Sequence, residues 1–190
     1  MRTGEVEWPN VADGVTLTDL SWMTGISVSN LSAYRSGAKH PAHAAAGKVS
    51  TAAASTGVIA SSHLLSIPRL GLSVKRLHAE DEVYCTQLVR QSFDQLAKHV
   101  HHPDDIAAYL IEPPGTRHRG WDLLLRGLAA HMAAFKRVSI PQWAKEPGAL
   151  PQPWSPGNMP ERRLMWDLIN TPQSFRERNV VFNRNWLISV

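Results

Sequence analysis

The sequence predicts a mainly α-helical protein with an N-terminal two-helix unit and a larger C-terminal helical domain. Apolar residues recur at helical spacing in several long segments, and clusters of Pro and Gly separate these segments. The one strand-like run, Val180 to Phe182, allows a short terminal strand. We expect a first domain at 1–60, a linker at 61–75 and a second domain at 76–190.

Composition narrows the class of protein. Of the 190 residues 43% are hydrophobic and 19% are charged, which is typical of a globular chain. The single cysteine excludes an internal disulfide and a Cys-rich zinc site. No apolar run approaches the roughly 18 residues of a membrane span, and the N-terminus lacks the basic flank of a signal peptide. A cytoplasmic protein without membrane contact is therefore expected.

The first element should be a short helix capped by Thr16 or Thr18, with Leu17, Leu20, Ser21 and Thr24 facing inward. Gly25 supplies a turn and Ile26 packs beneath it. A second short helix begins at Ser27, buries Leu31 and Tyr34, and is closed by Gly37. Two short helices joined by a glycine turn form a helix-turn-helix unit, whose second helix enters the major groove of DNA.

The stretch 14–41 resembles the lambda repressor and Cro-like (Xre-type) family of helix-turn-helix regulators. The positions that match are Gly14, Val15, Thr16, Leu20, Ser21, Gly25, Ile26, Ser27, Leu31, Ser32, Gly37 and Pro41. The chain departs from the family at Leu17, where the family has Gln, and at Arg35, where it has an acid. The family also has a full helix before this unit, whereas here Pro9 interrupts a short leader. Either the second domain or a partner is expected to cover that face.

The resemblance and the helix geometry together predict the residues that contact double-stranded DNA. Those expected on the exposed face are Ser27, Ser29, Asn30, Ala33 and Arg35. Asn30 is suited to bidentate pairing with adenine, and Ala33 to contact with a thymine methyl group. Thr16 and Thr18 at the start of the first helix, with Lys39 and His40, are expected to hold phosphates. The alternative is that these side chains only decorate a solvated helix.

The rest of the sequence predicts further helices. An Ala-rich helix should follow Pro41 and stop near Gly57, with a flexible tether as the alternative. A long amphipathic helix within 73–100 should bury Leu77, Val83, Tyr84, Leu88, Phe93, Leu96 and Val100. Helices are also expected at 105–110, 121–135 and 161–170. The proline-rich stretch 141–160 should be a loop pinned by Trp143 and Trp154.

Other chemistry-bearing residues favour structural roles. A set of His99, His101, His102, Asp104 and Asp105 suggests a metal site, but neighbours at a helix end do not converge, so a solvated terminus is favoured. Arg117, His118 and Arg119 are expected in an exposed loop, with phosphate or an acidic partner as the alternative. Cys85 is expected to be a buried thiol. With no phosphate loop, dinucleotide fingerprint or nucleophile elbow, we expect no enzyme, no cofactor and no metal.

The C-terminal part resembles, more loosely, a region of actinobacterial regulators and antitoxins. The resemblance rests on Trp121-Asp122, Pro141-x-Trp143, Pro153-Trp154 and the ending Phe175-Arg176-x-Arg178-Asn179-Val180. It implies a toxin protein as partner, with the first unit repressing the shared promoter. The alternatives are a phage or host repressor without a toxin, and an interaction module that uses the helix-turn-helix unit for packing.

Charge distribution adds a prediction about assembly. The net charge is +4, but residues 1–67 carry four basic and four acidic side chains, so the excess lies in 68–190. One copy of a neutral unit makes few phosphate contacts. The sequence therefore predicts a homodimer on a palindrome with half-sites roughly 34 Å apart, located at the nucleoid.

Overall fold

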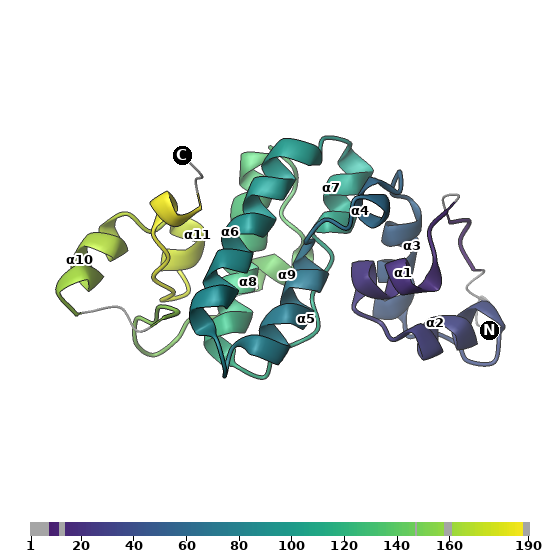
Figure 1. The fold of residues 1–190 in the computed structure, drawn as a ribbon, viewed down its shortest axis with the longest axis horizontal. Helices are drawn as coiled ribbons and strands as arrows, with labels where there is room; N and C mark the ends of the chain where they lie inside the picture. The colour runs from purple at the N-terminus through teal and green to yellow at the C-terminus, as the bar shows by residue number, and fades with distance from the viewer. Residues whose placement is uncertain (1–7, 12–13, 147, 158–160, 188–190) are drawn as a thin grey trace.

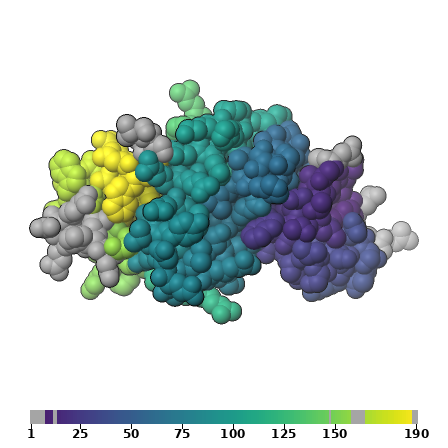
Figure 2. Space-filling view, viewed as in Figure 1, coloured from purple at the N-terminus to yellow at the C-terminus, as the bar shows by residue number. Residues whose placement is uncertain are grey.

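The computed structural model is an elongated stack of helices (Figures 1 and 2). It describes residues 8–11, 14–146, 148–157 and 161–187. The α-helices within these ranges are α1 Leu17–Thr24, α2 Val28–Arg35, α3 His43–Ala53, α4 Val58–Ser61, α5 Ile67–Leu77, α6 Glu82–His99, α7 Pro103–Tyr109, α8 Arg119–Phe135, α9 Gln142–Lys145, α10 Glu161–Ile169 and α11 Gln173–Arg176. A 3₁₀ turn, η1, spans Arg184–Trp186. The mainly α fold class is confirmed.

The N-terminal helices form one end of the molecule. Helix α1 packs against α2, α3, α4 and α5 (Figure 1). Its buried side chains are Leu20, Met23 and Thr24, whereas Leu17 and Ser21, which were expected to face inward, are only half-buried. Met23 is buried in their place, because α1 packs against α3, α4 and α5 as well as α2. The Ala-rich helix is confirmed as α3, and Gly57 takes the left-handed conformation after it, with φ of 84°.

The expected linker at 61–75 is wrong, because most of it belongs to α5. Ile67, Leu70 and Val74 repeat at helical spacing and are fully buried. Proline in the first turn of α5 suits a helix start, where its missing N–H has no partner to lose. The core therefore continues from Leu20 through α5 to Leu187 without a break.

The single long helix expected within 73–100 is also wrong. The chain breaks after Leu77, and Asp81 starts α6 by accepting the backbone N–H of Tyr84 at 2.8 Å. This break resets the phase of the following helix. Val83 and Tyr84 are therefore exposed rather than buried. The buried side of α6 is formed by Cys85, Leu88, Val89, Ser92, Phe93 and Leu96.

Helix α8 is the centre of the second half and is buried along most of its length. Two of its glycines allow other segments to approach closely. A methyl group on Gly120 would lie 2.7 Å from the Trp154 ring, and one on Gly127 would lie 2.7 Å from the Phe175 ring. Trp121 is fully buried and meets Trp154 edge to face. Trp143 and Trp154 pin the stretch as expected, through the Leu110 carbonyl and the Trp121 ring, but part of the expected loop, Gln142–Lys145, is the short helix α9.

The short terminal strand is corrected to a single bridge. Within the described ranges, Val180 pairs only with Trp154, in parallel, and no sheet forms. The reason is that residues 175–179 form hydrogen-bonded turns. In addition, Thr171 Oγ1 accepts a hydrogen bond from the backbone N–H of Phe182. Because of these bonds, only Val180 is left to form a strand-like bridge.

Later segments of the chain pack against the N-terminal helices, because α5 contacts α1 and residues 105–114 contact the turn after α1, α5 and Thr56. Pro114 packs against the Gly25 turn and Pro113 against Gly71 of α5. Asp105 of α7 accepts both the backbone N–H and the hydroxyl of Thr56, each at 2.8 Å. Within the described residues, no helix is long and apolar enough to cross a membrane.

Candidate nucleic-acid interface

Helix α1 begins with a capping box. Thr16 Oγ1 accepts the N–H of Asp19 at 3.2 Å, and Asp19 Oδ2 accepts the backbone N–H and the hydroxyl of Thr16 at 2.9 and 2.7 Å. This arrangement satisfies two of the unpaired groups at the helix start. It also places a carboxylate where phosphate was expected, so the cap of α1 has a built-in anion. Thr18, the other candidate there, is exposed.

The turn between the helices has the predicted chemistry. Gly25 has φ of 71°, in the left-handed region that glycine adopts without strain. The hydroxyl of Thr24 donates to the Leu20 carbonyl at 2.6 Å and accepts the N–H of Ile26 at 3.2 Å. Ser27 then caps α2 by accepting the N–H of Asn30 at 3.4 Å. These local bonds set the angle at which α2 leaves α1.

Helix α2 presents a polar face to solvent. Leu31 is its one fully buried residue and packs into the core. Ser27, Ser29 and Arg35 are exposed, as predicted, whereas Asn30 and Ala33 are half-buried. Val28 and Ser32 are also exposed, and the sequence reasoning missed them. For Ser32 the signal was available, because it adjoins the buried Leu31, whereas Val28 lies three residues before Leu31, on the side that helical spacing would bury.

The loop after α2 brings a cation to the middle of this face. Gly37 has φ of 75°, and the N–H of Lys39 donates to the Ala33 carbonyl at 3.2 Å, so the loop folds back along α2. Lys39 Nζ donates to Asn30 Oδ1 at 3.1 Å. That oxygen keeps a second lone pair and the amide keeps its two N–H groups for a further partner. His40 is exposed beside Lys39.

A second group of cations, missed by the sequence reasoning, lies beside α1. Arg69 of α5 stacks over the ring of Trp22 at 5.1 Å, and Arg76 lies 6.0 Å from the same ring centroid. Lys75 and Arg76 are exposed at the C-terminal end of α5. The signal was the series of basic residues Arg69, Lys75 and Arg76, of which the first two fall in the segment expected to be a linker.

Three of the histidine candidates make structural contacts, and of the expected loop 117–119 only Arg117 precedes the start of α8, because His118 caps the helix and Arg119 begins it. His102 caps α7 by accepting the N–H of Asp104 at 3.3 Å, and His101 contacts the Lys98 carbonyl at 3.1 Å. His118 caps α8 by accepting the N–H of Trp121 at 3.3 Å, while Arg117 and Arg119 are exposed. Asp105, counted in the same cluster, points instead to Thr56.

The thiol of Cys85 is unsuited to nucleophilic chemistry. It is fully buried, and burial, reinforced by the nearby carboxylates of Asp81 and Glu82, raises its pKa to about 11. A reactive cysteine needs the opposite shift, toward the thiolate.

Comparisons with known proteins return no match: no protein-family model, no curated protein and no solved structure is similar to this chain. The case for a function therefore rests on the residues themselves.

Proposed function

We propose that the protein binds double-stranded DNA in a sequence-specific manner and acts as a transcriptional repressor. The observation that carries the proposal is the outward face of α2, where an exposed polar helix follows a left-handed glycine turn and Lys39 is bonded to Asn30. Polar side chains on a second helix of this kind read base edges in the major groove. Ser29, Asn30 and Ala33 are the readout positions, and Val28 and Ser32 extend them.

Phosphate binding is assigned to cations around this face rather than to the start of α1. Because Asp19 already occupies the cap of α1, the side chains proposed to bind phosphate are Arg35, Lys39 and His40. Phosphate contacts fix the position of the protein on the duplex, and base contacts supply the specificity. Arg76 of α5, which lies over the Trp22 ring, supplies a further cation.

Two variants separate readout from phosphate binding. Duplexes are first selected from a random library with the parent protein, and affinities are then measured by fluorescence anisotropy at several salt concentrations. Asn30→Ala should weaken binding to the selected duplex by about 5-fold to 150-fold, the loss of roughly 1–3 kcal/mol of base contact, and leave random duplexes nearly unchanged. Arg35→Ala should weaken all duplexes alike and reduce the salt slope by about one.

The exposed residues Asn185 and Arg176 provide matched controls, because their alanine variants remove the same side-chain types far along the chain. If Asn30→Ala and Arg35→Ala both bind every duplex as the parent does, readout through α2 is wrong. The helix-turn-helix unit would then be a packing module.

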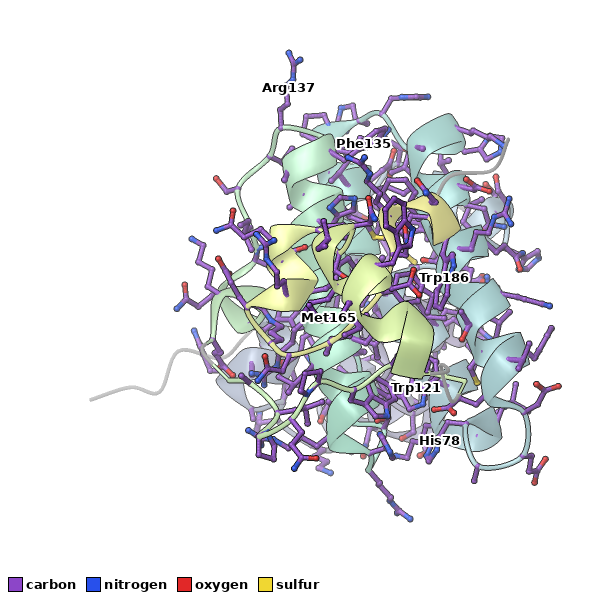
Figure 3. The ribbon with its side chains drawn as sticks, turned by 90° about the vertical axis from the view of Figure 1, so that its left-hand side faces the viewer. His78, Trp121, Phe135, Arg137, Met165 and Trp186 are labelled. Atoms are coloured by element: carbon purple, nitrogen blue, oxygen red, sulfur yellow. The ribbon has the colours of Figure 1, made fainter. Side chains whose placement is uncertain are left out.

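We further propose that the protein acts as a homodimer joined through α10. Met165, Trp166 and Ile169 are 67%, 64% and 69% exposed on this helix, at the end of the molecule that Figure 3 faces. Neighbouring large apolar side chains on a surface are typical of a protein interface. A second copy is the occupant that reading of two half-sites requires, because the neutral first unit alone makes few phosphate contacts.

Sedimentation analysis tests the dimer. The parent should sediment with about twice the 21.1 kDa mass of the chain, and Trp166→Glu should shift it to the monomer. Val83→Glu is the control, because Val83 is similarly exposed, at 61%, on α6. A parent that is monomeric both alone and on DNA contradicts the proposal.

The antitoxin role rests on the C-terminal resemblance alone and is proposed on that basis. Coexpression with the product of an adjacent reading frame tests it: relief of that product's toxicity and a stable complex are expected. Undiminished toxicity would contradict the antitoxin role, and the proposal of a repressor without a toxin partner would remain.

A further inference from the structure

A cavity of about 580 Å³ opens between the two halves of the protein. One wall is α3, a second is α7 with the residues that follow it, and the third is the segment from Val138 to Trp143 at the start of α9. Its size lies within the roughly 300–1,000 Å³ of sites that bind small molecules. The cavity is separate from the outward face of α2.

The floor of the cavity is apolar and rigidly held. Ile106, Leu110 and Ile111 are buried at its base. The indole of Trp143 is fixed at its edge, because Nε1 donates to the Leu110 carbonyl at 3.0 Å. Water gains few partners against such a lining, so an apolar molecule displaces it at little cost. The fixed ring also offers a flat face for aromatic stacking.

The charges at the rim indicate the chemistry of the ligand. Among the described residues, Lys48 and Glu112 are the two charged ones that line the cavity, and they neutralise each other. Lys48 Nζ lies 3.2 Å from Glu112 Oε2 and also donates to the Glu112 carbonyl at 3.1 Å. A charged ligand would have to break this pair to find a counterion. The remaining polar side chains, Thr51, Ser139 and Gln142, offer neutral hydrogen bonds.

We propose that this cavity binds an uncharged, largely apolar small molecule with an aromatic ring packed against Trp143. The inference does not depend on DNA binding, because none of the proposed readout residues lines the cavity. A measurement of ligand binding by the full chain, without DNA, therefore tests it.

Titration with Nile red, an uncharged apolar dye, tests the site. The parent should bind one dye per chain with blue-shifted emission. Ala107→Trp and Gly47→Phe fill the cavity from opposite walls, and each should weaken dye binding at least tenfold. A Cβ atom at Gly47 meets no heavy atom within 4 Å, so the ring can extend into the cavity, and glycine is a poor helix former, so this variant should fold at least as well as the parent.

Two controls decide where the dye binds. Ala79→Trp adds the same bulk at an exposed position between α5 and α6 and should leave the affinity unchanged. Trp166→Glu removes the apolar face of α10 and should also leave it unchanged. If the folded Gly47→Phe variant binds the dye as the parent does, or if Trp166→Glu abolishes binding, the proposal is overturned.

A matched pair of competitors tests the predicted neutrality. The uncharged 2-methoxynaphthalene should displace Nile red at a concentration at least tenfold lower than the anionic 2-naphthoate. Equal or better displacement by the anion would show that Lys48 is available to a carboxylate, and it would overturn the assignment of an uncharged ligand.

Discussion

Replacing Gly25 by alanine is expected to lower the free energy of unfolding by about 2–4 kcal/mol, through left-handed backbone strain and a steric clash. Gly25 has φ of 71°, which an alanine adopts only at a cost. The added methyl would also lie 2.8 Å from Cδ of Pro114, a ring atom that has little room to move. Denaturant unfolding followed by circular dichroism measures the change.

Gly37 provides a matched control because it has nearly the same conformation, with φ of 75°, and open space around it. Gly37→Ala should therefore cost about 1–2 kcal/mol, the strain alone. In a Pro114→Ala background, Gly25→Ala should cost as little as Gly37→Ala. Equal costs for the two glycines in the parent would show that Pro114 does not press on the turn.

Local chemistry made the helix-turn-helix unit predictable. A hydroxyl that accepts a nearby N–H defines each helix start, at Thr16 and Ser27, and a glycine with positive φ defines the turn. Each of these features involves residues at most four positions apart, so a short stretch of sequence is enough to predict it. The same holds for the burial of Leu31 in the middle of α2.

Helix boundaries were less predictable where two signals competed. The small residues before Ile67 suggested a linker, yet Ile67, Leu70 and Val74 are buried because neighbouring helices α1, α6 and α8 cover them. Tertiary burial overrode the local composition. Farther along, Asp81 restarts the helix and shifts its phase, which turned Val83 outward.

Features that depend on contacts between residues well separated in the sequence could not be predicted from the sequence. Lys39 meets Asn30 only because the loop folds back along α2, and Pro114 meets Gly25 only because the second half packs on the turn. The cavity has walls from three segments that are far apart in the sequence. A pattern within one helix contains no information about such pairs, so the structure was needed to find them.

The carboxylate of Asp105 joins the two halves of the protein, and Asp105→Ala is expected to lower the free energy of unfolding by about 2–4 kcal/mol. The side chain is 3% exposed, and its two oxygens accept the N–H and the hydroxyl of Thr56, each at 2.8 Å. Removing it leaves both donors without their acceptor and opens a gap between α7 and the start of α4. For a chain of this size the melting temperature should fall by roughly 10 °C.

The neighbouring residue Asp104 is the control, since it carries the same charge on the same turn of α7 but is exposed. Its carboxylate lies 3.6 Å from His102, a surface pair worth about 1 kcal/mol or less. Asp105→Asn should have an intermediate effect, because the amide keeps one acceptor and turns its NH₂ group toward a Thr56 donor. If Asp104→Ala and Asp105→Ala cost the same, helix charge rather than the bond to Thr56 stabilises this end of α7, and the junction between the halves depends on apolar packing alone.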